Sequence, residues 1–182
     1  MKTISDHVLD IAQNALEAKA TLINIIVIEN KIDDFYMLII NDNGCGMNEK
    51  ILQLAENPFF TTRTSRKVGL GIPLLKQNAT ASNGTFKLSS DEGKGTSIKA
   101  VFQWSHIDRP PTGDIWNTIF LLMAGNPAIH FKYTHTTDKG TFAIDSIELR
   151  TLLEGISLQQ GDVRKAFIEL IKNNLEDIKA SK

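Results

Sequence analysis

The chain has 182 residues, of which 42% are hydrophobic and 23% charged, with a formal net charge of -1 at pH 7. This composition fits a globular protein with one core and room for a small appendage, and it argues against a dedicated nucleic-acid binder, which usually carries a basic excess. No apolar run approaches the roughly 20 residues that span a membrane, and because the N-terminal residues quickly become polar we expect no secretory signal. Because a single cysteine cannot form an internal disulfide, we expect a cytoplasmic protein.

The N-terminal part of the chain predicts the element order α-β-β-α-loop-α-β-β. The predicted helices are residues 5–18, 48–55 and 69–79, and the predicted strands are residues 22–29, 35–41, 85–90 and 96–104. Residues 56–67 lack periodicity and are predicted to form a loop. This order indicates an α+β protein, a two-layer α/β sandwich with helices on one face of a mixed sheet.

A polar, proline-rich stretch at residues 108–113 has the composition of a linker. Beyond it the pattern predicts a helix, a hairpin and two further helices, at residues 114–124, 129–145, 146–153 and 162–178. We therefore divide the chain into an ATP-binding-type unit at residues 1–105 and a small α+β unit of unknown role at residues 106–182.

Asp10 and Asn14 lie four residues apart on the first predicted helix, so their side chains project in nearly the same direction. An amide oxygen can ligate Mg²⁺ that is also held by phosphates, because this hard cation prefers oxygen donors. A carboxylate one turn earlier can orient a water molecule or accept its proton. The spacing alone is far more often that of a solvated helix face.

The segment Asp42-Asn-Gly44-Cys-Gly46-Met47 directly follows a predicted strand. Asp42 can accept a hydrogen bond from an exocyclic amine such as that of adenine. The two glycines allow a tight bend and the close approach of a flat ring, and Met47 adds a polarizable wall. A dinucleotide fingerprint is disfavoured because Glu49 stands where its third glycine would be.

Two later segments complete the set of motifs. Residues 59–71 contain Phe-Phe-Thr61-Thr62-Arg63 and end with Gly69-Leu70-Gly71 at the start of a predicted helix, where free backbone N–H groups attract phosphate oxygens. Residues 93–96, Gly-Lys-Gly-Thr96, place a hydroxyl at the start of a strand. No P-loop sequence is present.

These four segments, in this order, resemble the GHKL superfamily of ATP-binding domains, which includes gyrase B, heat-shock-ninety chaperones, MutL and sensor histidine kinases. The resemblance covers roughly residues 4–104. It implies the Bergerat ATP-binding fold and assigns Asn14 to Mg²⁺ and Asp42 to the adenine amine. It further implies that Gly44, Gly46 and Met47 line the base and that Thr96 assists Asp42. The lid and phosphate contacts would come from Thr61, Thr62, Arg63, Gly69, Leu70 and Gly71.

Two departures from the family pattern bear on activity. Hydrolytic members carry Glu four residues before the metal-binding Asn, where this chain has the shorter Asp10, so we expect slow turnover. Histidine kinases usually carry Lys where this chain has Glu17. His7, on the same helix, is predicted to be a local polar residue rather than a phosphate acceptor.

Three functions stay open at this point. The first is a regulatory Mg-ATP-binding protein in which slow hydrolysis drives a conformational switch, with Asp10 as the catalytic residue. The second is a kinase that phosphorylates a protein partner in trans, and the third is a module that binds nucleotide without turnover. A protein partner is expected in each case, but its identity and the oligomeric state are not indicated.

Overall fold

The computed structural model of the protein describes residues 1–55 and 71–181. The helices are α1 (Ile4–Glu17), α2 (Glu49–Ala55), α3 (Gly71–Ala81), α4 (Ile115–Gly125), α5 (Ser146–Leu152) and α6 (Gly161–Asp177). The strands are β1 (Leu22–Asn30), β2 (Phe35–Asp42), β3 (Thr85–Asp91), β4 (Gly95–Gln103), β5 (His130–Thr137) and β6 (Gly140–Asp145). No helix in the described part of the chain is both long and apolar enough to cross a membrane.

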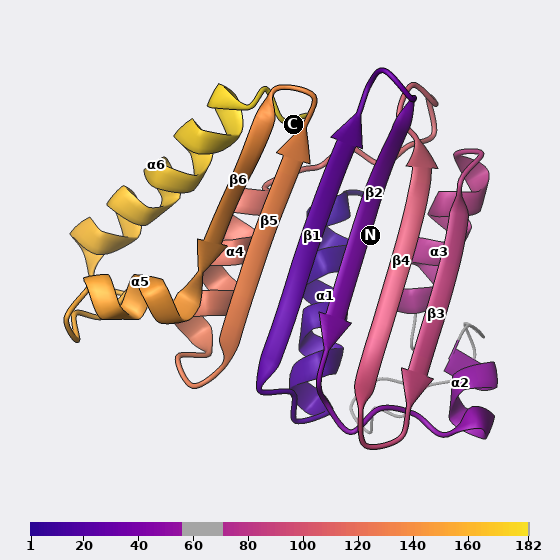
Figure 1. The fold of residues 1–182 in the computed structure, drawn as a ribbon, viewed down its shortest axis with the longest axis horizontal. Helices are drawn as coiled ribbons and strands as arrows, with labels where there is room; N and C mark the ends of the chain where they lie inside the picture. Colours follow the sequence, from indigo (N-terminus) through magenta and orange to yellow (C-terminus); the bar gives the residue numbers. More distant parts are fainter. Residues whose placement is uncertain (56–70, 182) are drawn as a thin grey trace.

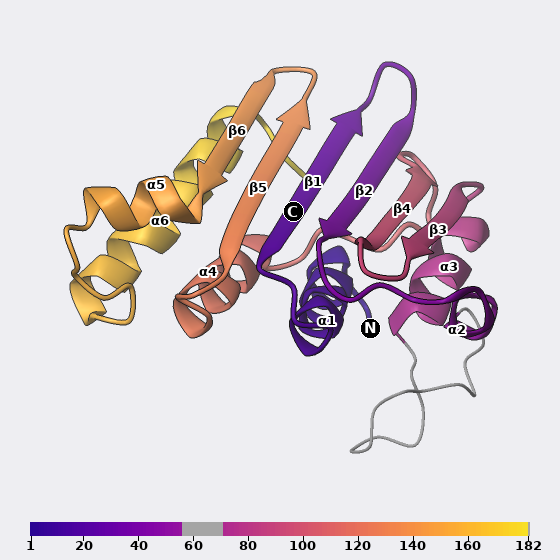
Figure 2. The same cartoon turned by 60° about the horizontal axis from the view of Figure 1, so that its bottom comes forward.

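The strands of the described residues form one mixed sheet in the order β3-β4-β2-β1-β5-β6. Neighbouring strands are antiparallel except β1 and β5, which are parallel. Figures 1 and 2 show α1, α3 and α4 packed on the same face of this sheet. The predicted fold class, a two-layer arrangement with helices on one face of a mixed sheet, is therefore confirmed.

Helix α1 begins at a capping box. The Thr3 hydroxyl accepts a hydrogen bond from the Asp6 backbone N–H, and the Asp6 carboxylate accepts one from the Thr3 N–H, each at 3.1 Å. The helix then buries Val8, Ile11 and Ala15 at the spacing of one helical face. Because this face packs into the core, the half-buried side chains of Asp10 and Asn14 lie on a different side of α1.

The core lies between the sheet and these helices. Strands β1 and β2 alternate buried and half-buried side chains, and the buried set includes Ile23, Ile25, Val27, Leu38 and Ile40. Because alternate residues of a strand point to opposite faces, the register of the sheet also fixes which polar residues share the helix-covered face.

The C-terminal part of the chain continues the N-terminal sheet. Strand β5 pairs with β1 from Leu22↔His130 to Ile28↔Thr136, and β6 pairs with β5. The proline-rich stretch is held against α1, since the N–H groups of Ile4 and Ser5 donate to the carbonyls of Pro111 and Thr112. The division into two domains at residue 105 stays a prediction, and this pairing makes it testable.

A buried polar cluster also ties the two parts together. The Glu29 carboxylate accepts hydrogen bonds from the Trp104 indole at 3.2 Å and the Ser181 backbone N–H at 2.8 Å, and it lies 2.8 Å from Nε2 of His135. Nδ1 of His135 is 2.7 Å from the Tyr133 hydroxyl. Burial opposes ionisation of Glu29, but the hydrogen bonds led by His135 outweigh it and lower the pKa of the carboxyl.

Candidate functional site

Helix α1 is the element around which the predicted site residues gather. Asp10 and Asn14 are both half-buried on it and one turn apart, as the spacing predicted. The helix ends at Ala18, whose backbone N–H donates to the Asn14 carbonyl at 2.9 Å. Asp10 and Ala18 are therefore about 12 Å apart along the helix axis, and the other motifs contact the helix near these two residues.

The Asp10 end of this stretch meets the start of α3. A Cβ atom built on Gly71 would lie only 1.8 Å from Oδ2 of Asp10, so no other residue fits there without a shift of the carboxylate. The candidate catalytic carboxylate is thus in contact with the first residue of α3. Backbone N–H groups at a helix start favour anions, which makes this end suited to phosphate.

The Ala18 end meets the glycine box. The Cys45 N–H donates to the Ala18 carbonyl at 2.8 Å, and a Cβ atom on Gly44 would lie 2.8 Å from the same oxygen. The Asn43 side chain holds the box in place, because its Oδ1 accepts from the N–H groups of Thr21 and Leu22 at 2.8 Å each. This anchoring role of Asn43 had not been predicted.

The glycine box also packs on the hairpin between β3 and β4. The Gly93 N–H donates to the Cys45 carbonyl at 2.7 Å. A Cβ atom on Gly46, whose φ is +65°, would lie 2.0 Å from the Asp91 carbonyl oxygen, and one on Gly95 would lie 2.0 Å from that of Asp42. These contacts explain in physical terms why both motifs need glycine.

Asp42, Thr96 and Ser90 form one cross-strand row. Asp42 pairs with Thr96, and Thr96 pairs with Ser90, so the three side chains project from the same face of the sheet. Ile23, which pairs with Asp42, is buried on this face. Burial raises the pKa of the Asp42 carboxyl above its ordinary value, while the N–H groups of Gly44 and Thr96 partly offset this. Oδ1 of Asp42 accepts the Gly44 N–H at 2.8 Å.

Met47 follows the box on the way to α2. Its N–H donates to the Ser90 hydroxyl at 2.9 Å, which fixes the backbone of the box beside the row of polar side chains. Asn48 caps α2, since its Oδ1 accepts the Ile51 N–H at 3.0 Å.

Thr61, Thr62, Arg63, Gly69 and Leu70 lie outside the described residues, so their assignment to the lid and phosphate contacts stays a prediction. Of the predicted site residues that the structure describes, Gly71 meets Asp10 in the middle of α1, and Asn14 lies one turn further along the helix. The glycine box, which includes Asp42, Gly44, Gly46 and Met47, reaches the C-terminal end of α1, and Thr96 pairs with Asp42.

His7 has a structural role that the sequence did not indicate. Its ring is fully buried between α1 and α3, and Nε2 lies 2.9 Å from the Asn78 amide nitrogen. Nδ1 has no hydrogen-bond partner among the described residues. Burial, helped by the positive N-terminus, lowers the pKa of His7 to about 4, so the ring is neutral at pH 7.

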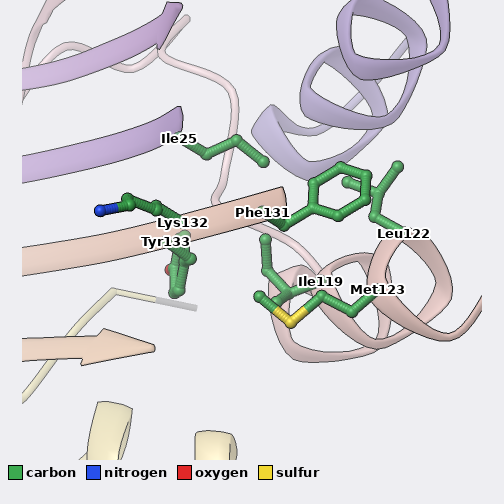
Figure 3. Close-up of a pocket in the computed structure, with 7 residues that line it drawn as sticks. All are labelled: Ile25, Ile119, Leu122, Met123, Phe131, Lys132 and Tyr133. Atoms are coloured by element: carbon green, nitrogen blue, oxygen red, sulfur yellow. The ribbon is translucent and has the colours of Figure 1, made fainter. Parts of the chain in front are cut away.

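A small apolar pocket lies elsewhere, between α4 and strands β1 and β5 (Figure 3). It has no room for a water-sized molecule, and it is lined by Ile25, Ile119, Leu122, Met123, Phe131, Lys132 and Tyr133. Its lining is almost entirely apolar and includes none of the motif residues. We therefore regard it as a packing gap of the core.

The motif residues are compatible with a nucleotide and Mg²⁺. Gly44 and Gly46 carry no side chain, which lets the backbone of the glycine box pack closely on Ala18 and Asp91. Asp42 and Thr96 supply hydrogen-bond groups for a base. No group of three or more His, Cys, Asp or Glu in the described part of the chain could hold a metal by itself. A cation held by one amide and by phosphates is compatible with this finding.

Comparison with known proteins agrees with this geometry. The family model described as "Histidine kinase-, DNA gyrase B-, and HSP90-like ATPase" matches residues 3–106, more than half of the chain. This range contains every motif described above.

Individual relatives match the same part of the chain. A protein of Shewanella frigidimarina described as a sensor protein is 35% identical over 102 residues, which are 55% of this chain and 16% of that protein. Sporulation kinase E of Bacillus subtilis is 35% identical over 89 residues, 48% of this chain and 12% of the kinase. The chain thus spans about a sixth or less of the length of these relatives.

A solved structure, the MutL ATPase domain of Aquifex aeolicus complexed with ADP, is 13% identical with a TM-score of 0.45. The match covers 85% of this chain and 68% of that one.

Proposed function

The chain belongs to the family of histidine kinase-, DNA gyrase B- and HSP90-like ATPases, and we propose that it binds Mg-ATP and uses it in a regulatory role. The observation that carries this proposal is the convergence of the motifs on α1: Gly71 meets Asp10 in the middle of the helix, and the glycine box meets Ala18 at its C-terminal end. A base near Asp42 and phosphates near Gly71 would then extend along the helix.

In this proposal each residue has a role that follows from its chemistry. Asp42 and Thr96 accept hydrogen bonds from the base, and the backbone around Gly44 and Gly46 lies against its ring. Asn14 holds Mg²⁺ by its amide oxygen, and the start of α3 attracts phosphate oxygens. The bound cation would neutralise phosphate charge during transfer. Thr61, Thr62, Arg63, Gly69 and Leu70 are proposed to close over the phosphates.

We propose slow hydrolysis that drives a conformational switch, with Asp10 as the catalytic group. Its carboxylate is one methylene shorter than Glu and is packed against Gly71. A carboxylate with this reach would orient the attacking water poorly, so the ATP-bound state would persist long enough to act as a signal.

Transfer of phosphate to a protein partner is the second candidate, and one observation favours it. Sporulation kinase E, a protein named as a kinase, is 35% identical to the chain over 89 residues. In this case Asp10 would accept the proton of the partner's attacking group. Binding without turnover is the remaining alternative.

An assay with ATP labelled on the γ-phosphate separates these possibilities. The purified chain is incubated with Mg-ATP, alone and with extract of its source cells, and both free phosphate and labelled protein are measured. Slow release of phosphate by the chain alone supports the switch. A labelled band other than the chain supports phosphotransfer. Neither product, with binding retained, would leave only the binding module.

A further inference from the structure

Ser90 lies at the end of β3, in the same cross-strand row as Asp42 and Thr96. It pairs directly with Thr96 of β4, which in turn pairs with Asp42 of β2. Its neighbour Ser89 points to the opposite face of the sheet, where it is exposed and pairs with Ser97. Two adjacent serines thus have different environments, and only Ser90 contacts the proposed base site.

The Ser90 hydroxyl makes three hydrogen bonds. It donates to the Gly95 carbonyl at 2.8 Å and accepts the Met47 N–H at 2.9 Å. It also lies 3.0 Å from Oγ1 of Thr96, a pair in which either oxygen could donate. Through these bonds Ser90 joins the glycine box, the β3–β4 hairpin and the residue expected to assist Asp42.

The number of protons determines the direction of the third bond. A hydroxyl has one proton and two lone pairs, whereas a carbonyl oxygen can only accept. The Ser90 proton is used by the Gly95 carbonyl, and one lone pair is used by the Met47 N–H. The remaining lone pair therefore accepts the proton of Thr96, whose own oxygen is left with lone pairs only.

We infer that Ser90 is a positioning residue that holds the Thr96 hydroxyl as a hydrogen-bond acceptor, and thereby selects a 6-aminopurine over a 6-oxopurine. The inference rests on the proposed function, namely that the base lies beside Asp42 and Thr96. Adenine presents an amino group at position 6, which donates, whereas guanine presents a carbonyl oxygen, which accepts. Two acceptors on the protein suit the first base and repel the second.

The test compares ATP and GTP binding by calorimetry in the presence of Mg²⁺. In Ser90→Ala the Thr96 hydroxyl is free to rotate and donate, so ATP should bind about fivefold to tenfold more weakly, the effect of one neutral hydrogen bond. GTP binding should stay the same or improve, so the preference for ATP falls. Ser90→Thr keeps the hydroxyl and should restore the preference. Ser89→Ala is the matched control and should change neither nucleotide.

Two further variants test whether Ser90→Ala acts through misfolding, and whether Ser90 acts by positioning Thr96 or by a general effect on the packing of the site. Ser90→Cys fills similar space with a weakly hydrogen-bonding thiol and should lower the preference in the same direction. In a Thr96→Val background, Ser90→Ala should have no additional effect on the ratio of ATP to GTP affinity, because the hydroxyl it orients is gone. An additional effect in that background would mean that Ser90 acts by another route.

The outcomes for the inference and for the proposed function are distinct. If the wild-type chain binds ATP in preference to GTP and Ser90→Ala keeps the same preference, or weakens both nucleotides equally, the inference is overturned and the ATP site stands. If the wild-type chain binds neither nucleotide, the proposed function fails and the inference falls with it.

Discussion

At the scale of single residues, the buried carboxyl of Asp42 makes the most direct prediction about ligand choice. Asp42→Asn replaces an acceptor with a group that can also donate, so adenine nucleotides should bind about 1–3 kcal/mol more weakly, the cost of leaving a buried polar group mispaired. Calorimetry with ATP and GTP measures this. GTP should lose less or gain, and an equal loss for both would contradict a role in reading the base.

The control for this variant is Asp91→Asn in the β3–β4 hairpin. Its side chain is 72% exposed and lies 3.4 Å from the Lys94 ammonium group. Removal of this charge should leave the affinity for both nucleotides unchanged, because an exposed ion pair contributes little.

A comparison of Gly46 and Gly93 separates two costs of adding a side chain, namely backbone strain at positive φ and a steric clash of the new Cβ atom. Both have positive φ, +65° and +79°, but a Cβ atom meets the Asp91 carbonyl at 2.0 Å only at Gly46 and has open space at Gly93. Gly93→Ala should cost about 1 kcal/mol, the strain of the left-handed conformation alone. Gly46→Ala should lower the free energy of unfolding substantially more, as measured by urea denaturation. Equal losses would show that the packing of the glycine box on the hairpin adds nothing.

At the scale of elements, His7 joins α1 to α3 and makes their packing sensitive to pH. The unfolded chain protonates His7 near pH 6.5, whereas the folded chain does so near pH 4. Between these values the unfolded state binds more protons, so stability is complete above pH 6.5 and falls as the pH drops through 4. A difference of this size is worth roughly 3 kcal/mol at most.

The measurement is urea denaturation at several pH values for the wild type and for His7→Gln, which retains a hydrogen-bonding side chain but does not titrate. The variant should show a flatter dependence between pH 6.5 and 4. Gln77→Ala, an exposed change on α3 that removes no titrating group, should leave the wild-type slope intact. An unchanged slope in His7→Gln would contradict the role of this ring.

The individual elements could be predicted from the sequence because their signals are local. Residues 22–29 and 35–41 were predicted as an antiparallel pair from branched and aromatic side chains, and they form β1 and β2. The family resemblance assigned Asp42 and Thr96 to the same site, and the structure pairs these two residues across β2 and β4, which the sequence alone could not show.

Other features depend on contacts between distant segments, which local patterns do not encode. Residues 129–136 were predicted as one strand of a hairpin, but the sequence did not show that this strand pairs in parallel with β1. Ser90 is an ordinary polar strand residue until the register places it against Thr96 and Met47. His7 was expected to be a local polar residue, and only the packing of α3 shows its partner, Asn78.

At the scale of the whole molecule, the sheet bears on whether residues 1–105 form an independent domain. Without β5, strand β1 becomes a sheet edge, and Glu29 loses both His135 and the Ser181 N–H. Loss of partners for a buried charge is strongly destabilising. We therefore expect a fragment of residues 1–105 to show no cooperative thermal unfolding, and the addition of residues 106–182 to restore it. A fragment that unfolds at the midpoint of the whole chain would establish two independent domains.

The central claim is that the chain binds ATP through a magnesium ion held by Asn14 on α1, and calorimetric titration with ATP tests it most directly. Titrations are run with and without Mg²⁺ on the wild type, on Asn14→Ala and on Gln13→Ala, an exposed neighbour on the same helix. The account predicts saturable Mg-dependent binding by the wild type and Gln13→Ala, and its loss in Asn14→Ala with the fold retained. Equal Mg-ATP affinity in all three proteins would contradict it.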